Sequence, residues 1–168
     1  RFSGGGTVVC DQSTVFVSLI CEQSCLRDFG IPDPSPRKVM QWSGDVYKGA
    51  FDKAPGAALL NVDRDVRLNE HDYCIGDRKF GGNAQSFSKS RFVHHTSLLW
   101  DFDPDNMKYL LLPEKMPDYR QARQHEDFLV SLKTYVPERV DIHDAVLGTL
   151  QENFFDTIEL GVDSLLAS

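Results

Sequence analysis

Apolar and polar positions alternate in short runs along the first two thirds of the chain, and glycine, asparagine or aspartate bounds most of these runs. Short runs that are rich in β-branched and aromatic residues predict β-strands. The strands that we expect are Thr7–Val9, Val15–Ile20, Ala57–Leu60, Val66–Leu68, Tyr73–Ile75, Phe92–Val93, Ser97–Trp100 and a final Thr157–Leu160.

Other segments carry apolar residues at the three- and four-residue spacing of a helix. Ser35 and Pro36 are typical of an N-cap and a first helical position, and the apolar stripe that follows them ends near Phe51. The prolines within residues 22–36 predict a loop before this helix. The other helices that we expect are Asn106–Leu112, Tyr119–Leu132 and Asp141–Phe154. Strands first and helices last predict an α+β fold, with a mixed, mostly antiparallel sheet backed by helices.

Composition and charge narrow the class of protein. A chain of 168 residues with 41% hydrophobic and 26% charged residues is typical of one globular domain, which we place at residues 1–168. The net charge of −7, without a dense basic run, predicts no nucleic-acid partner. No apolar run approaches the roughly 18 residues of a membrane-spanning helix, so we expect no membrane partner.

The cysteine spacing and the first residue indicate in which cellular compartment the protein is expected. Cys10, Cys21, Cys25 and Cys74 show neither CxxC spacing nor a disulfide framework. We therefore expect free thiols in a reducing intracellular compartment, either the cytoplasm or the matrix of a mitochondrion or plastid. The chain begins at Arg1 without a methionine, so we expect an N-terminally truncated domain whose targeting segment, if any, lies upstream.

Residues 77–84 place one lysine just before two glycines and a side-chain amide. Gly81 and Gly82 lack a Cβ atom, so they predict a sharp turn that another group can approach closely. Lys79 supplies a compact positive charge that suits a phosphate or a developing oxyanion. A solvated lysine on a surface hairpin explains the same residues, so this segment alone leaves both interpretations open.

A second glycine-dense segment, residues 1–6, opens the chain. It is no P-loop, because no Gly-Lys-Ser/Thr follows it. It does not fit a dinucleotide-binding turn either, because a strand rather than a helix is expected next. Two glycine-rich turns, each joined to a cation, predict two walls of one anion-binding pocket.

The spacing of the candidate ligands does not fit a metal site at either of two segments, and we expect no protein-only metal site. Asp101 begins a segment that resembles a calcium loop, but Asn106 stands where glycine is needed and Leu112 where glutamate is needed. His94 and His95 are consecutive, so on a strand they face opposite sides and cannot form a paired metal site. We expect one of the two histidines near the pocket and the other in a structural role.

Three blocks together resemble the lipoate–protein ligase family, within the biotin/lipoate ligase superfamily. Residues 1–8 resemble its Arg-Arg-x-Ser-Gly-Gly-Gly signature, residues 77–84 its Lys-x-Ser/Gly-Gly-Ser/Asn-Ala signature, and residues 94–99 its His-His-Gly-Thr-Leu-Leu strand. Asn69 to Asp72 lies where the family has Asn-Asp. Order and spacing agree from Arg1 to about Asp103. The resemblance implies a fold of the class II synthetase and biotin/lipoate ligase type.

The same resemblance implies an ATP-dependent lipoate–protein ligase with Mg²⁺. The carboxylate of lipoate would attack the α-phosphate of ATP, and the resulting lipoyl-AMP would pass its acyl group to a lysine of a carrier domain. The implied carriers are lipoyl domains of 2-oxoacid dehydrogenase complexes or the H protein of glycine cleavage. Lys79 would be the catalytic residue, because it would neutralise charge that grows in both steps.

The resemblance also assigns the remaining site residues. Asp72, Lys79 and Thr96 would bind the nucleotide. The residues that would bind the acyl substrate are Arg1, Ser3, Gly4, Gly5, Gly6, Gly81, Gly82, Asn83, Ala84 and His95.

Departures from the family pattern keep alternatives open. The first arginine of the first block is missing, Cys10 stands where many members have histidine, and Thr96 replaces a glycine. An acyltransferase that moves preformed octanoyl or lipoyl groups through a thiol such as Cys10 would fit these departures. A small packed side chain explains Cys10 as well. A non-catalytic homologue that keeps only the binding pocket is the third interpretation.

Overall fold

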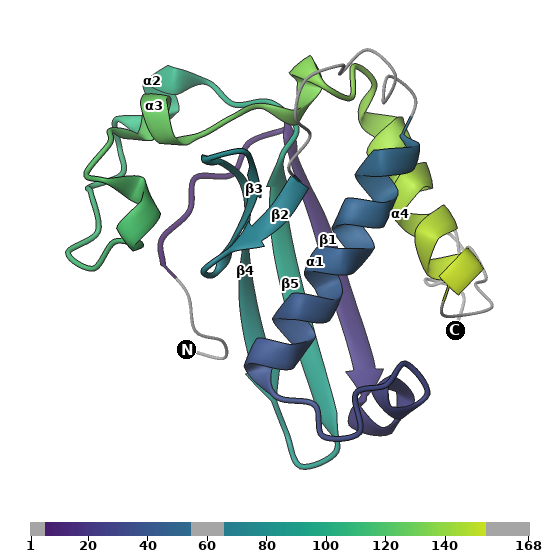
Figure 1. Cartoon of the computed structure of the whole chain (residues 1–168). Helices are drawn as coiled ribbons and strands as arrows, with labels where there is room; N and C mark the ends of the chain where they lie inside the picture. The colour runs from purple at the N-terminus through teal and green to yellow at the C-terminus, as the bar shows by residue number, and fades with distance from the viewer. Residues whose placement is uncertain (1–5, 55–65, 154–168) are drawn as a thin grey trace, which may run out of the picture.

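The structure is a computed structural model and describes residues 6–54 and 66–153. Its sheet has five antiparallel strands in the order β1-β5-β4-β3-β2. The strands are β1 (Thr14–Glu22), β2 (Val66–Asn69), β3 (Asp72–Ile75), β4 (Arg78–Phe87) and β5 (Arg91–Leu99). The long hairpin of β4 and β5 is flanked by β1 on one side and by the shorter β2–β3 hairpin on the other (Figure 1).

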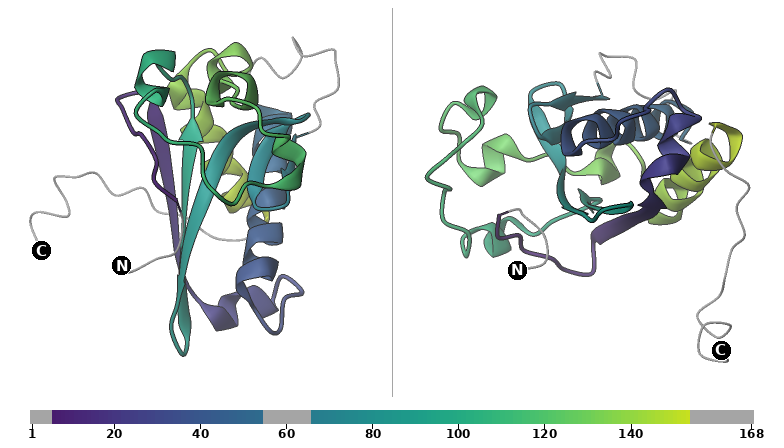
Figure 2. Two further views of the ribbon diagram at one scale, coloured as in Figure 1. Left: turned by 90° about the vertical axis from the view of Figure 1, so that its left-hand side faces the viewer. Right: turned by 90° about the horizontal axis from the view of Figure 1, so that it is seen from below.

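Helices lie mainly on one side of this sheet. The two long helices, α1 (Pro36–Lys53) and α4 (Arg139–Asn153), pack against each other and cover the same face (Figure 2). Residues 6–13 run along the opposite side of the sheet. The short elements are η1 (Gln23–Arg27), α2 (Pro104–Met107), η3 (Asp118–Arg120), α3 (His125–Phe128) and η4 (Leu132–Thr134). The predicted α+β class with an antiparallel sheet backed by helices is confirmed.

The main core lies between the sheet and the two long helices. Ser35 caps α1, because its Oγ accepts a hydrogen bond from the backbone N–H of Lys38 at 3.4 Å, and Pro36 occupies the first turn. Burial of the apolar face of α1 against the sheet and α4 is the main stabilising contribution. Core members from these three elements include Tyr47, Ala50, Phe51, Tyr73, Phe80, Leu98, Ile142 and Val146. No helix in the described part of the chain is long and apolar enough to cross a membrane.

A chain of polar groups crosses this core. The hydroxyls of Ser43 and Tyr73 lie 2.7 Å apart, and the Tyr73 hydroxyl lies 2.8 Å from Nε2 of His94. His94 is fully buried, and this burial lowers its pKa from 6.5 to about 4. The ring is therefore neutral at neutral pH, and it joins β5 to β3 and α1 through hydrogen bonds.

The register of β3 against β4 shifts by one residue. Tyr73 pairs with Gly81, whereas Cys74 pairs with Lys79, which leaves Phe80 as an additional residue in β4. A bulge of this kind re-aims the neighbouring side chains. Phe80 is fully buried in the core below α1, and a Cβ atom on Gly81 would also point into that core. Lys79 is left facing the side of the sheet away from α1.

Several strand expectations are corrected. Gly81 and Gly82 lie inside β4 and not in a turn; the turn of the β3–β4 hairpin is at Gly76, which has a φ of +60°. Residues 7–9 form no strand, because the chain pairs with β5 only from Thr14 onward. The two short strands expected at 92–93 and 97–100 are one continuous strand, β5. The strands expected at 57–60 and 157–160 lie outside the described residues.

The helix expected at 119–132 is wrong. Gln121 and Ala122 have left-handed backbone angles, with φ of 51° and 58°, which end the helical path after η3. The side chains of Arg120 and Arg123 each donate from Nε to the other's backbone carbonyl, at 3.0 and 3.1 Å, and so replace helical hydrogen bonds. The helix expected at 106–112 is reduced to α2, and the loop at 22–36 contains η1. The helices expected at 36–51 and 141–154 are confirmed as α1 and α4.

A methyl group at Gly81 has no room in the β4–β5 ladder. Its Cβ atom would lie 2.9 Å from Cδ2 of Leu98 and 3.2 Å from the backbone oxygen of Ser97. We expect Gly81→Ala to lower the free energy of unfolding by about 1–3 kcal/mol in denaturant titrations. Gly148→Ala in α4 is the control, because no atom lies within 4 Å of its Cβ atom, so helix propensity should raise stability slightly. Equal stability of the two variants would contradict the close approach.

His94 should make stability depend on pH in the acid range. Its pKa is 6.5 in the unfolded chain and about 4 when folded, so the unfolded chain binds the proton more readily as pH falls through this range. Stability should therefore be complete above pH 6.5 and fall towards pH 4, by on the order of 2–3 kcal/mol. Denaturant titrations between these pH values should show a flatter slope for His94→Gln, whereas His95→Gln should keep the slope of the unmodified protein. A full slope in His94→Gln would assign the pH dependence to other groups.

Candidate functional site

A cavity of about 1050 Å³ lies between residues 6–9, strands β4 and β5, and side chains from residues 107–129. Gly6, the described end of the first glycine-rich segment, therefore lines the same cavity as residues of the second segment. The predicted site residues within the described ranges all line this cavity: Gly6, Asp72, Lys79, Gly81, Gly82, Asn83, Ala84, His95 and Thr96. The predicted residues Arg1, Ser3, Gly4 and Gly5 lie outside the described residues.

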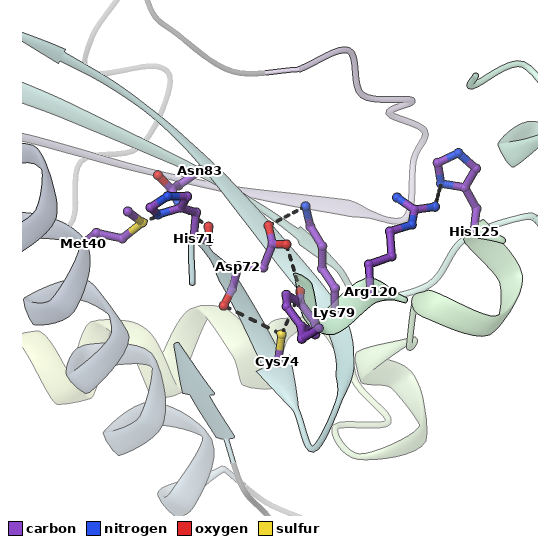
Figure 3. A network of polar contacts seen from close by, with 9 residues as sticks. Met40, His71, Asp72, Cys74, Lys79, Asn83, Arg120 and His125 are labelled. Carbon is purple, nitrogen blue, oxygen red and sulfur yellow. Dashed lines mark hydrogen bonds and ion pairs between the residues drawn. The ribbon is translucent and has the colours of Figure 1, made fainter. Parts of the chain in front are cut away.

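Lys79 reaches the cavity because of the register shift in β4. Its Nζ lies 2.7 Å from Oδ1 of Asp72, and 27% of the lysine side chain is exposed (Figure 3). A Cβ atom on Gly82 would lie 3.2 Å from the same Nζ. The absence of a side chain at Gly82 therefore allows the Lys79 ammonium group to approach the backbone closely, and it is not needed for a turn. The ammonium group lies against the strand instead of in open solvent.

Asp72 divides its carboxylate between two partners. Oδ1 pairs with Lys79, and Oδ2 accepts a hydrogen bond from the Tyr119 hydroxyl at 2.8 Å. The thiol of Cys74 donates in turn to the Tyr119 oxygen at 3.2 Å. Burial, together with the neighbouring thiol and carboxylate, raises the pKa of Tyr119, so the phenol keeps its proton and remains a donor. Tyr119 and Lys79 therefore fix the position of the Asp72 carboxylate, and that carboxylate fixes the position of the Lys79 ammonium.

A buried arginine lines the same cavity. Arg120 is 4% exposed, and its guanidinium lies 4.5 Å from the centre of the Phe128 ring. Its Nε donates to the carbonyl of Arg123 at 3.0 Å, and an Nη donates to Nδ1 of His125 at 3.3 Å (Figure 3). Burial and the charge of Arg120 lower the pKa of His125, so a neutral ring accepts this hydrogen bond. The site thus holds a second cation beside Lys79.

Asn83 and His95 line the cavity, and each forms a hydrogen bond with a neighbouring part of the chain. The Asn83 amide donates to the backbone carbonyl of His71 at 2.9 Å and lies 3.2 Å from Sδ of Met40 in α1. Nδ1 of His95 lies 2.7 Å from the Ser18 hydroxyl of β1. Their predicted role in substrate binding stays a prediction, and the contacts fix both side chains in the wall of the cavity.

Alternation along β5 separates the two consecutive histidines. His94 and Thr96 are fully buried, whereas His95 is partly exposed on the opposite face and lines the cavity. The prediction that one histidine lies near the pocket and the other has a structural role is confirmed. The role of Thr96 in nucleotide binding stays a prediction; its side chain lies on the same face of β5 as His94.

The cysteines do not support a thiol nucleophile. Cys10, Cys21, Cys25 and Cys74 are all described and free, and none of them is among the described residues that line the cavity. Partial burial and Asp11 raise the pKa of Cys10, and burial raises the pKa of Cys74 to about 11. A raised pKa keeps a thiol protonated and weakly nucleophilic at neutral pH.

The cavity offers little for a metal ion by itself. No cluster of three or more histidine, cysteine, aspartate or glutamate residues occurs among the described residues. Asp72 is the one carboxylate among the described lining residues. A single carboxylate suits Mg²⁺, which keeps several waters and takes most other ligands from substrate phosphates. These residues therefore fit a Mg²⁺ ion that is held jointly by the protein and a phosphate ligand.

Sequence reasoning missed the side chains that complete this site. Tyr119, Arg120 and His125 all lie in the segment that we expected to form one long helix. Because the backbone turns at Gln121 and Ala122 instead, Arg120 and His125 line the cavity and Tyr119 holds Asp72. No motif or spacing marks these residues in the sequence, so only the fold identifies them.

Comparison with known proteins places this chain in a family. The family model of the lipoyl protein ligase A/B catalytic domain matches residues 1–154. A curated relative, the inactive lipoate–protein ligase 2 of Plasmodium falciparum (isolate 3D7), is 32% identical over 166 residues. That match covers 85% of this chain and 42% of the relative.

Solved structures show the same fold. A lipoate–protein ligase A bound with ATP has a TM-score of 0.64 at 16% identity, and a bi-partite lipoate protein ligase from Thermoplasma acidophilum, studied with its E2 lipoyl domain, has 0.61 at 19%. Both matches cover 99% of this chain and 63% of the other. P. falciparum LipL1 in complex with lipoate has a TM-score of 0.59 at 18% identity over 94% of this chain and 41% of that one. This chain therefore spans less than two thirds of each of these relatives, and it belongs to the lipoyl protein ligase A/B catalytic domain family.

Proposed function

We propose that this domain activates lipoate with ATP and transfers the lipoyl group to a lysine of a carrier domain. The observation that carries this proposal is the position of the Lys79 ammonium, which lies in the cavity between Asp72 and the bare backbone of Gly82. A preorganised charge at this point suits a reaction in which negative charge grows on phosphoryl and acyl oxygens.

The lining of the cavity suits a ligand with an apolar body and a charged end. Beside the polar groups of β4, the cavity is lined by apolar side chains from five separate parts of the chain. These are Val8, Val9, Phe16, Met40, Leu99, Leu110, Leu111 and Leu112. Pockets for small molecules combine an apolar wall with a few convergent polar groups. An acyl chain would pack on the apolar wall and present its carboxylate to Lys79.

The proposed reaction has two steps. In the first, a carboxylate oxygen of lipoate bonds to the α-phosphorus of ATP, and the bond from that phosphorus to pyrophosphate breaks. In the second, the lysine amine of the carrier bonds to the acyl carbon, AMP leaves, and the amine loses a proton. Lys79 would stabilise charge in both steps, and Asp72 would keep its ammonium in place. When bound, Mg²⁺ would offset phosphate charge, with Asp72 as its protein ligand.

The partners and the compartment are part of the same proposal. A structural neighbour is described with its E2 lipoyl domain, which supports lipoyl domains of 2-oxoacid dehydrogenase complexes as carriers, with the glycine cleavage H protein as the other candidate. The four free thiols agree with a reducing intracellular compartment.

A non-catalytic homologue that only binds ligand is the second candidate, because the relative at 32% identity is named an inactive ligase. Lipoate-dependent exchange of pyrophosphate into ATP, measured on the complete protein, separates the two. Exchange supports the ligase, whereas binding of lipoate or nucleotide without exchange or transfer supports the homologue. Transfer from a preformed acyl group without ATP would instead support an acyltransferase.

Lys79→Ala should reduce pyrophosphate exchange about a hundredfold, which corresponds to a barrier increase on the order of 3 kcal/mol. The reason is the loss of the one ammonium group held against the strand at the reacting centre. Lys48→Ala is the matched control, because Lys48 lies on the exposed face of α1, pairs with Asp52 at 3.1 Å and is not one of the described residues that line the cavity. Near-normal exchange in Lys79→Ala would remove this lysine from the mechanism.

Gly82→Ala should reduce exchange about tenfold with little change in thermal stability. The added Cβ atom would meet the far end of a flexible side chain, Nζ of Lys79 at 3.2 Å, so the ammonium must move while the fold is kept. Gly81→Ala provides the contrast, since its Cβ atom would meet backbone and core atoms and should act mainly on stability. If Gly82→Ala unfolds the protein and leaves the activity of the folded fraction unchanged, the space is structural only.

A further inference from the structure

The cavity carries two positive side chains and one negative side chain among its described lining residues. These are Lys79, Arg120 and Asp72, which give two positive charges minus one negative charge, or +1 with the histidines neutral. The whole chain has a net charge of −7. A positive pocket in an acidic protein focuses its field on an anionic ligand.

The two cations differ in how their charge is compensated. Lys79 forms an ion pair with Asp72 at 2.7 Å, whereas Arg120 forms no ion pair with a carboxylate in the described part of the chain. The partners of Arg120 are a carbonyl, a neutral imidazole and the face of an aromatic ring. Such partners fix the orientation of the guanidinium, but they do not neutralise it. A buried charge without a counter-ion in direct contact is costly, and an anionic ligand would lower that cost.

The neighbouring Arg123 shows what a structural arginine looks like in the same segment. Its guanidinium lies 5.5 Å from the centre of the Phe128 ring, close to the same ring that Arg120 covers. It also pairs with Asp77 at 3.0 Å, and it is not one of the described residues lining the cavity. Arg123 is in direct contact with a carboxylate, whereas Asp72 acts on the charge of Arg120 only from beyond ion-pair distance.

We infer that Arg120 is a second phosphate-binding residue, which holds the phosphates beyond the first of a nucleoside triphosphate, while Lys79 faces the first. This inference rests on the proposed function and names the part of the substrate that this residue recognises. One ammonium group shared with Asp72 cannot balance several phosphate charges. A planar guanidinium binds phosphate oxygens in a bidentate manner and stays charged when buried. The acyl substrate has a single carboxylate, which is needed at Lys79, so it would leave Arg120 without an anion.

Arg120 would act in only one of the two proposed steps. When the bond between the α-phosphorus and the bridging oxygen breaks, its electron pair stays with the departing pyrophosphate, and Arg120 would stabilise that charge. The transfer step involves AMP, which has one phosphate only. Arg120 should therefore act on the first step alone, whereas Lys79 should act on both.

Binding measurements on the complete protein test this difference. Arg120→Met, which keeps the volume of the side chain, should lower the affinity for inorganic pyrophosphate and for α,β-methylene-ATP about tenfold to a hundredfold by calorimetry. Its affinity for AMP should stay within about twofold. Arg120→Lys keeps the charge but loses the fork, so it should recover part of the lost affinity. Arg91→Met is the matched control, because Arg91 is exposed, pairs with Glu22 at 3.3 Å and is not one of the described residues that line the cavity, so this variant should bind all three ligands normally.

The outcomes separate this inference from the proposed function. Equal losses for AMP and pyrophosphate in Arg120→Met, or no loss for pyrophosphate, would overturn the role of Arg120, as would unmodified protein that binds neither pyrophosphate nor the ATP analogue. If Arg120→Met does not fold, Arg120→Lys decides: an unchanged affinity for pyrophosphate overturns the inference. Selective loss of pyrophosphate binding without any pyrophosphate exchange would sustain Arg120 as the phosphate site and reject the ligase activity.

Discussion

The candidate site depends on one ion pair, between Lys79 and Asp72, and that pair depends on a bulge in β4. In a regular strand, Lys79 and Gly82 would face opposite sides, because side chains alternate. The additional residue Phe80 brings both to the cavity side, while Phe80 itself is buried in the core. The bulge therefore has two effects: it buries Phe80 in the core, and it directs the Lys79 ammonium to the cavity. A bulge beside a functional site is a common arrangement.

The segment after β5 gives this ion pair its surroundings. Its backbone is joined directly to the lysine, because the N–H of Val130 donates to the carbonyl of Lys79 at 2.9 Å and Leu129 forms a parallel bridge with it. The same segment carries Tyr119, which holds Asp72, and Arg120, which supplies the second charge. A long helix here would carry these side chains away from the sheet. The short, broken elements allow polar side chains to reach the cavity at separate points.

Membership of the family and catalytic activity are separate matters for this chain. The relative at 32% identity is named inactive, and the solved neighbours at 16–19% identity establish the fold only. A cavity can persist after the chemistry is lost, because its walls are also the sheet and the core. The charges inside it also make structural contacts, such as the hydrogen bond from Arg120 to the carbonyl of Arg123. Arg120 nevertheless lacks a carboxylate partner within the described chain, which is easier to explain by a ligand than by stability.

The sequence by itself determined the family, the α+β class, the long helices α1 and α4 and most of the strand positions, because apolar periodicity, a Ser-Pro cap and three spaced motifs are local signals. It also predicted that the glycine-rich segments at residues 1–6 and 77–84 share a pocket, and the described part of both, from Gly6 and from Lys79 onward, lines one cavity. Only the tertiary structure decided that Gly81 and Gly82 lie within a strand, since the reason is contact with Leu98 and Lys79 rather than a turn. It alone replaced the helix at 119–132, where side-chain hydrogen bonds and left-handed residues override helical propensity. Long-range contacts of this kind leave no periodic trace in a chain, so the residues that complete the site, Tyr119 and Arg120, could be found only in the fold.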